Sequence, residues 1–167
     1  MILANIDFGH DVEVHDSSTV NNVTLGDHVK VGKRCSLFGS ATHLLSIGPH
    51  SYIGPNTTVQ GYAAPIAIGA RVSIAQNVNI MSSSGPNASP LMQRYFPLLV
   101  EAVHIGDDSW IGANAVILPG VTLGEFCVVA ANSLVSASFP AFSVIGGNPA
   151  RLLRRLDPAV VRTQTSH

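Results

Sequence analysis

Histidine is the side chain in this 167-residue chain best suited to move a proton at neutral pH, because imidazole titrates near pH 6.5. Of the seven histidines, His104 and His43 are the candidates for a general base, and an ordinary surface position is the alternative for each. A histidine-bound metal would need three converging ligands. No close pair of the required kind occurs among His10, His15, His28, His43, His50 and His104. We therefore expect no metal.

Guanidinium groups gather near the end of the chain. Four of the nine basic residues fall within the last seventeen positions: Arg151, Arg154, Arg155 and Arg162. Arginine matches the geometry of phosphate oxygens, so this cluster suits a ligand with a pyrophosphate or a sugar phosphate. The alternative is a solvated basic helix face. Three consecutive serines, Ser82–Ser84, have no base beside them and indicate loop polarity or contacts to an acceptor molecule rather than a nucleophile.

Composition narrows the class of protein. The net charge of −1 removes any global argument for nucleic-acid binding, and no apolar run approaches the ~20 residues that span a bilayer. The first residues have neither a basic stretch nor a long apolar run, so we expect no signal peptide. Cys35 and Cys127 give no disulfide framework, and we expect the cytoplasm.

The elements that position these residues follow a period of six. Aliphatic residues recur at Ile105, Ile111, Ile117, Leu123, Val129 and Val135, and a slim residue stands four places after most of them. This spacing fits neither a helix nor a plain alternating strand. It fits short strands joined by tight turns, three to a coil, with both Cys35 and Cys127 pointing inward; glycines would supply positive φ at the turns. The predicted fold is a triangular parallel β-helix, with an ordinary β-sandwich as the alternative.

The period is interrupted three times. The step grows to ten residues between Leu37 and Ile47, to nine between Val59 and Ile68, and to twenty-five between Ile80 and Ile105. Each interruption follows the third hexapeptide of a coil, so we expect all three insertions (about 38–46, 60–67 and 82–104) at one corner. Insertions in repeat proteins commonly map to the binding face. The alternative is that this corner merely tolerates insertions and has no binding role.

The ends depart from the pattern. The stretch through Asn22 repeats only loosely and predicts an irregular cap coil. We expect the β-helix over residues 1–147 and a C-terminal helical cap and tail over 148–167. There, Asn148-Pro149 predicts a helix start before a short helix at 150–156, and Asp157-Pro158 a second one. Residues 163–167 are expected to be frayed.

Three motifs carry a resemblance to a known family: IGDDSWIGAN at 105–114, LPGVTLG at 118–124 and GGNPAR at 146–151. They closely resemble the hexapeptide-repeat acetyltransferases, in particular the galactoside, maltose and polysaccharide O-acetyltransferase branch. The likeness covers roughly residues 68–156. It implies an all-β, left-handed parallel β-helix, a homotrimer with active sites between subunits, and acetyl-CoA as the donor.

The resemblance also implies positions for CoA. By this match, Ala113 and Ala131 offer backbone groups to the pantetheine arm. Trp110 stands at a turn position, and from that position we expect it to pack against the cofactor or a neighbouring subunit. Ser136 and Ala137 take the place of a pair that is often Thr-Lys, so one lysine is missing here. Arg151 and Arg154 match arginines near the nucleotide end.

The catalytic position departs from the family. The usual histidine slot, where the chain enters the long loop, falls on Gly85, or on Ser84 if the match slips by one, with Asn87 close by. Three hypotheses follow. Another histidine serves as the base, with His104 preferred over His43. Alternatively, an amine acceptor that arrives unprotonated needs no side-chain base, or the chain has lost catalysis.

We therefore expect a CoA-dependent acyltransferase, with acetyl as the group, that acts on a hydroxyl or amine of a small molecule such as a sugar or sugar nucleotide. Nucleic acid and membrane are not expected as partners. The alternative is a non-catalytic hexapeptide-repeat scaffold or ligand-binding protein that lost transferase activity.

Overall fold

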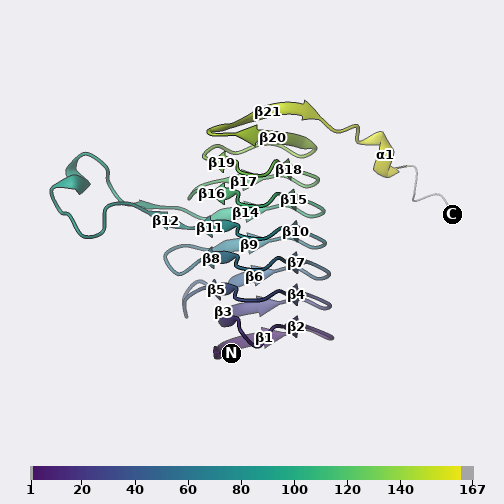
Figure 1. Cartoon of the computed structure of the whole chain (residues 1–167), viewed down its shortest axis with the longest axis horizontal. Helices are drawn as coiled ribbons and strands as arrows, with labels where there is room; N and C mark the ends of the chain where they lie inside the picture. The colour runs from purple at the N-terminus through teal and green to yellow at the C-terminus, as the bar shows by residue number, and fades with distance from the viewer. Residues whose placement is uncertain (1, 163–167) are drawn as a thin grey trace.

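The computed structural model describes residues 2–162 as a stack of β-coils with three flat faces. Successive coils pair in parallel, so residues equivalent in the six-residue period lie above one another; Ser73 and Ile74, for example, pair with Trp110 and Ile111. Figure 1 shows the coils rising from the N-terminal end to the C-terminal end, with one long arm on one side. The predicted parallel β-helix is confirmed.

Each coil contributes one strand to each face. Face 1 holds β6 (Leu45–Ile47), β9 (Ile66–Ile68), β14 (Val103–Ile105) and β17 (Thr122–Leu123). Face 2 holds β2 (Glu13–Val14), β4 (Lys30–Val31), β7 (Tyr52–Ile53), β10 (Ser73–Ile74), β15 (Trp110–Ile111), β18 (Val128–Val129) and β20 (Ser143–Gly147). Face 3 holds β5 (Ser36–Phe38), β8 (Thr58–Gln60), β11 (Asn79–Met81), β16 (Val116–Ile117) and β19 (Leu134–Val135). The strand β3 (Thr19–Leu25) turns from face 3 into face 1, pairing first with β5 and then with β6.

The interior is filled by the columns that the period predicted. Ile105, Ile111, Ile117 and Leu123 are fully buried, and the slim positions are filled by small residues such as Ser109 and Ala115. Buried serine hydroxyls are satisfied by the coil backbone: Ser109 Oγ donates to Gly124 O and accepts from Cys127 N. The prism is therefore packed throughout, and its chemistry must lie on the outside.

The residues that take positive φ at the corner turns differ from those expected. Positive φ falls mostly on non-glycine residues, such as His28, Asn77, Asn114 and Phe126. The repeated glycines are needed because neighbouring coils approach closely; a Cβ added to Gly106 would lie 2.4 Å from Glu125 N. The prediction that glycines supply the positive φ was wrong for these corners, since coil stacking decides where a side chain has no room.

All three insertions leave at the corner between face 3 and face 1, as the interrupted period predicted; we call it the insertion corner. They join β5 to β6, β8 to β9, and β11 to β14. The longest forms the arm seen in Figure 1, with the paired strands β12 (Ser83–Ser84) and β13 (Leu99–Val100) at its base and the 3-10 helix η1 (Met92–Arg94) near its tip.

The two ends differ from expectation. At the N-terminus, β1 (Ile2–Phe8) pairs in register with β3, so this end is a regular coil rather than an irregular cap. At the C-terminus, the helix predicted at 150–156 is wrong. β21 (Ala150–Arg155) is a strand that folds back antiparallel on β20, because that edge of face 2 offers open backbone groups, and the Asn148–Pro149 bond is cis. A short helix does follow Asp157-Pro158, as α1 (Ala159–Arg162), while residues 163–167 lie outside the described part. Within residues 2–162, the helices are too short to cross a bilayer.

Candidate functional site

An apolar groove lies beside the corner between face 2 and face 3, and it brings together three of the predicted CoA residues. Its volume is about 470 Å³, and its lining is Ala75, Trp110, Gly112, Ala113, Val128, Val129, Ala130 and Ala131. Trp110 begins β15, and its side chain is 58% exposed on the outer surface of face 2. Ala113 and Ala131 occupy the same turn in successive coils, where Asn132 N donates to Ala113 O.

The period explains why these residues form a groove. Their turns carry Gly and Ala, and an added Cβ on Gly112 would lie 2.6 Å from Ala131 N, so the corner stays narrow. Next to the groove, four residues on adjacent strands of face 2 lie in register. They are Trp110, Val128, Val144 and Arg154. An apolar strip thus runs from the groove to a guanidinium group at the end of the molecule.

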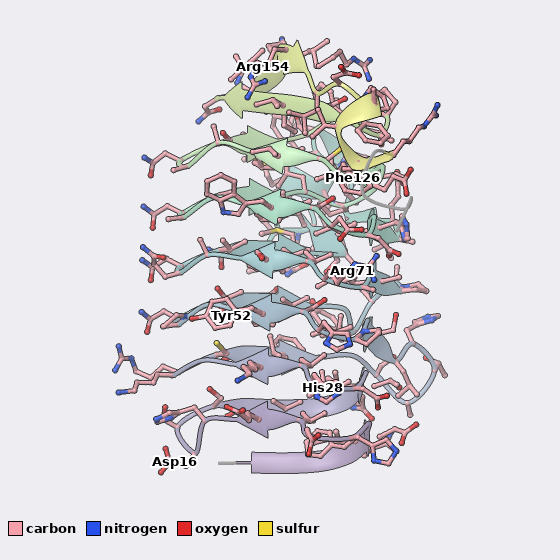
Figure 2. The ribbon with its side chains drawn as sticks, turned by 90° about the vertical axis from the view of Figure 1, so that its right-hand side faces the viewer. Asp16, His28, Tyr52, Arg71, Phe126 and Arg154 are labelled. Carbon is pink, nitrogen blue, oxygen red and sulfur yellow. The ribbon has the colours of Figure 1, made fainter. Side chains whose placement is uncertain are left out.

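The two predicted arginines lie on β21, which crosses the top of face 2. Arg154 lines a second cavity of about 300 Å³ with Phe126, Phe142, Leu156, Asp157, Val160 and Val161. Phe126 and Phe142 stack with centroids 4.9 Å apart, and Figure 2 shows Arg154 at the top of this face with Phe126 at its edge. Arg151 is exposed, and its Nη1 donates to Ala150 O.

Ser136 and Ala137 lie elsewhere. They follow β19, so they are exposed at the insertion corner rather than beside Ala113 and Ala131. Face 3 separates the two corners. Within one chain, the structure does not bring this pair to the groove.

A pocket of about 220 Å³ lies at the insertion corner, at the base of the arm, and it contains two of the three loop residues singled out in the sequence. Its lining is Tyr62, Ala63, Ser83, Ser84, Asn87, Leu98, Leu99 and Val100. Gly85 is overlaid by Leu98: an added Cβ there would lie 2.6 Å from Leu98 Cδ2 and 3.1 Å from Leu98 Cα. A side chain at position 85 would therefore require Leu98 to shift.

The two candidate bases lie near this pocket in the sequence but are not part of its lining. His104 is an exposed residue of β14, in register with Ala67 and Thr122 on the outer surface of face 1. His43 is half-buried in the first insertion, where its N–H bonds to Ser40. The two register partners of His104, Ala67 and Thr122, are uncharged.

Both cysteines are core residues, as the inward positions predicted. Burial raises the pKa of the Cys35 thiol and that of the Cys127 thiol, which keeps both protonated and unreactive at neutral pH. Among residues 2–162, no group of three His, Cys, Asp or Glu side chains is placed to hold a metal ion.

Sequence analysis missed Tyr62 and Phe38. Their rings stack at the insertion corner with centroids 6.0 Å apart and planes at 18°, and Ser83 Oγ donates to Tyr62 Oη over 3.2 Å. Tyr62 lies in an insertion with no period, so the only available signal was an aromatic residue in a short loop on the predicted binding edge.

Comparisons with known proteins agree with this architecture. The family model described as bacterial transferase hexapeptide (six repeats) matches residues 102–137. The first curated relatives, from Staphylococcus aureus, are 42% identical over 55 residues, which are 33% of this chain and 28% of theirs. The galactoside O-acetyltransferase of Escherichia coli (strain K12) is 34% identical over 121 residues, 72% of this chain and 57% of that protein. The matched segments thus span between about a quarter and three fifths of these relatives.

Two solved structures extend the likeness. A hexapeptide-repeat-containing acetyltransferase from Vibrio cholerae, complexed with acetyl coenzyme A, is 31% identical with a TM-score of 0.64, covering 89% of this chain and 70% of that one. An N-acyltransferase from Bacillus cereus, in complex with dTDP and 3-hydroxybutyryl-CoA, has a TM-score of 0.80 at 20% identity, covering 96% of this chain and 88% of that one. The second likeness shows the fold alone.

Fold and groove together define a hexapeptide-repeat β-helix protein with an outer apolar groove and an inserted arm. With the coverage and identity just given, the chain belongs to the hexapeptide-repeat acetyltransferase family.

Proposed function

We propose that this chain is a CoA-dependent acyltransferase that moves an acetyl group from acetyl-CoA to a hydroxyl or amino group of a sugar-like small molecule. The observation that carries the proposal is the apolar groove that places Trp110 beside Ala113 and Ala131. The family resemblance assigns Ala113 and Ala131 to the pantetheine arm, and Trp110 is the expected packing surface for the cofactor. Its Gly and Ala lining lets a narrow chain approach the backbone, while Trp110 supplies a large apolar wall.

The charged end of CoA has a matching surface. Along face 2, the strip from Trp110 through Val128 and Val144 ends at Arg154, and Arg151 lies on the same strand, β21. Guanidinium groups at that end suit the pyrophosphate and 3′-phosphate, and apolar side chains suit the pantetheine arm between them. Ser136 and Ala137 remain proposed cofactor contacts, and at the insertion corner they would reach CoA held by another copy.

The arrangement supports a homotrimer. The groove and the pocket at the base of the arm lie at different corners of one prism, so a neighbouring copy is needed to place a CoA groove beside an acceptor pocket. The arm carries large exposed apolar side chains that an assembly would cover, including Tyr95 at 80% and Phe96 at 67% exposed. Two free, buried cysteines fit a reducing compartment, and we propose the cytoplasm.

For a hydroxyl acceptor we propose His104 as the general base, with His43 as the less favoured candidate. His104 returns to face 1 directly after the arm, so in an assembly it lies close to the corner where the acceptor enters. A sugar or sugar nucleotide is the acceptor class that the family resemblance suggests.

The test is release of free CoA thiol from acetyl-CoA in the presence of paired sugars and amino-sugars, together with calorimetric CoA binding. Ala131→Glu places a carboxylate in the groove, and we expect CoA binding and turnover to fall at least tenfold. The matched control is Ala41→Glu, at an exposed position of the first insertion, which should leave CoA binding unchanged. CoA binding with no turnover on any acceptor would favour the scaffold hypothesis instead.

A further inference from the structure

The pocket at the base of the arm, which we propose as the acceptor pocket, has Tyr62 as an aromatic wall. Tyr62 is 47% exposed, so one part of its ring faces the solvent while the other packs parallel to Phe38. Its hydroxyl is fixed by the hydrogen bond from Ser83 at the base of the arm. The second insertion and the arm are tied together once more where Ala64 N donates to Ser82 Oγ. Tyr62 is therefore held in place before any ligand arrives.

The rest of the pocket is neutral. Ala63, Leu98, Leu99 and Val100 supply aliphatic surface, and its other polar groups are the hydroxyls of Ser83 and Ser84 and the amide of Asn87. A cation or an anion that entered would lose water without gaining a counter-ion, which is costly. An uncharged ring bearing hydroxyl or amino groups would keep its hydrogen bonds and lay its flat side on Tyr62.

The residues that line the pocket determine whether a hydroxyl or an amine of the acceptor can attack the thioester. A sugar hydroxyl attacks a thioester efficiently only when a base within hydrogen-bond reach takes its proton. Serine, tyrosine and asparagine are poor bases at neutral pH, and Gly85, at the usual histidine position, has no side chain. An amine is different, because its neutral form attacks with its own lone pair, and a desolvating pocket favours that neutral form.

We infer, resting on the proposed acyl transfer, that this pocket takes a small, ring-shaped primary amine in its uncharged form, with Tyr62 beneath the ring, and that acylation occurs at nitrogen without a side-chain base. The amine lone pair forms the new C–N bond at the thioester carbonyl, and the C–S bond breaks. CoA leaves as the thiolate, and the proton lost by nitrogen passes through solvent to give CoA thiol and a neutral amide. Positioning of the two reactants supplies the rate enhancement.

The experiment compares amine and alcohol acceptors that share one ring, such as glucosamine and glucose, by thiol release across pH 5.5–9. We expect turnover of the amine only, with kcat/KM rising tenfold per pH unit up to the pKa of the amine itself. The bend in the pH profile of kcat/KM should move with that pKa when amines of different basicity are used.

Transfer to the alcohol at a comparable rate, or a bend in the pH profile that stays at one pH whatever the basicity of the amine, would overturn the inference while leaving the proposed acyltransferase intact. Absence of thiol release with every acceptor would instead overturn the proposed acyltransferase, and this inference with it.

Tyr62 gives a second readout. Tyr62→Ala should raise KM for the amine at least tenfold while the affinity for acetyl-CoA stays the same. Tyr62→Phe keeps the ring and should change KM less than threefold. Equal losses in both variants, or weaker acetyl-CoA binding in Tyr62→Ala, would contradict the proposed role of the ring.

Discussion

At the scale of single residues, the arginines of β21 differ in what holds them. Arg155 Nη1 donates to Ala141 O, a contact that ties the strand to the coil below. Arg154 lies at the end of the apolar strip, and Arg151 stays exposed on the same strand. Arg155 thus bonds to a distant part of the coil, whereas Arg151 bonds to the carbonyl of its neighbour Ala150, so we propose Arg151 and Arg154 as the phosphate contacts.

We predict that Arg151→Ala and Arg154→Ala each weaken CoA binding by about 1.5–3 kcal/mol, as for loss of a hydrogen bond to a charged group. Titration calorimetry with CoA and with 3′-dephospho-CoA measures this directly. A variant that has lost the 3′-phosphate contact should bind the two ligands equally. Arg94→Ala, in the arm, is the control; unchanged CoA affinity in both β21 variants would refute the placement of the nucleotide end.

At the scale of elements, close stacking between coils determines where the chain needs glycine. A Cβ added at Gly106 would lie 2.4 Å from Glu125 N and 2.5 Å from Gly124 C of the next coil, whereas a Cβ at Gly61 would meet its nearest atoms at 3.5 Å, an ordinary van der Waals contact. The contrast separates glycines required by coil stacking from one that only lies at a coil exit.

Gly106→Ala should therefore lower the free energy of unfolding by about 1–3 kcal/mol, because the new methyl group overpacks against backbone. Gly61→Ala is the matched substitution, and we expect a change within about 0.5 kcal/mol. Urea denaturation of both variants measures the difference. Equal stability of the two would show that the coils can separate at no cost.

At the scale of the whole molecule, the arm exposes several large apolar side chains to solvent in the single chain. Leu91, Tyr95 and Phe96 are each more than 60% exposed, and η1 has no buried residue. A projecting apolar segment of this kind is typical of a surface that another chain covers.

We predict that the double variant Tyr95→Ser with Phe96→Ser shifts the proposed trimer toward monomer in sedimentation velocity, because the covered apolar area is lost. Arg94→Ser, at the last residue of η1 directly before Tyr95, should leave the mass unchanged. A double variant that remains trimeric would place the subunit contacts on the faces of the prism instead.

The sequence by itself determined the prism, its buried columns and the corner of the insertions, since each of these follows from one short signal repeated many times. Ile105, Ile111 and Ile117 occupy the same position of the repeat and are all buried. The fold can therefore be predicted from the repeats together even where one repeat departs from the pattern. Family motifs likewise located Trp110, Ala113 and Ala131.

Only the tertiary structure decided the rest. Tyr62 lies in the second insertion and Ser83 and Leu98 in the third, with one coil of the prism between the two insertions. They meet because the two insertions pack against each other at one corner. The strand at Ala150–Arg155 was missed for a similar reason. It pairs with β20 at the open edge of face 2, and that edge exists only once the coils have stacked. Repeated local patterns specify the scaffold, whereas single long-range contacts specify its pockets.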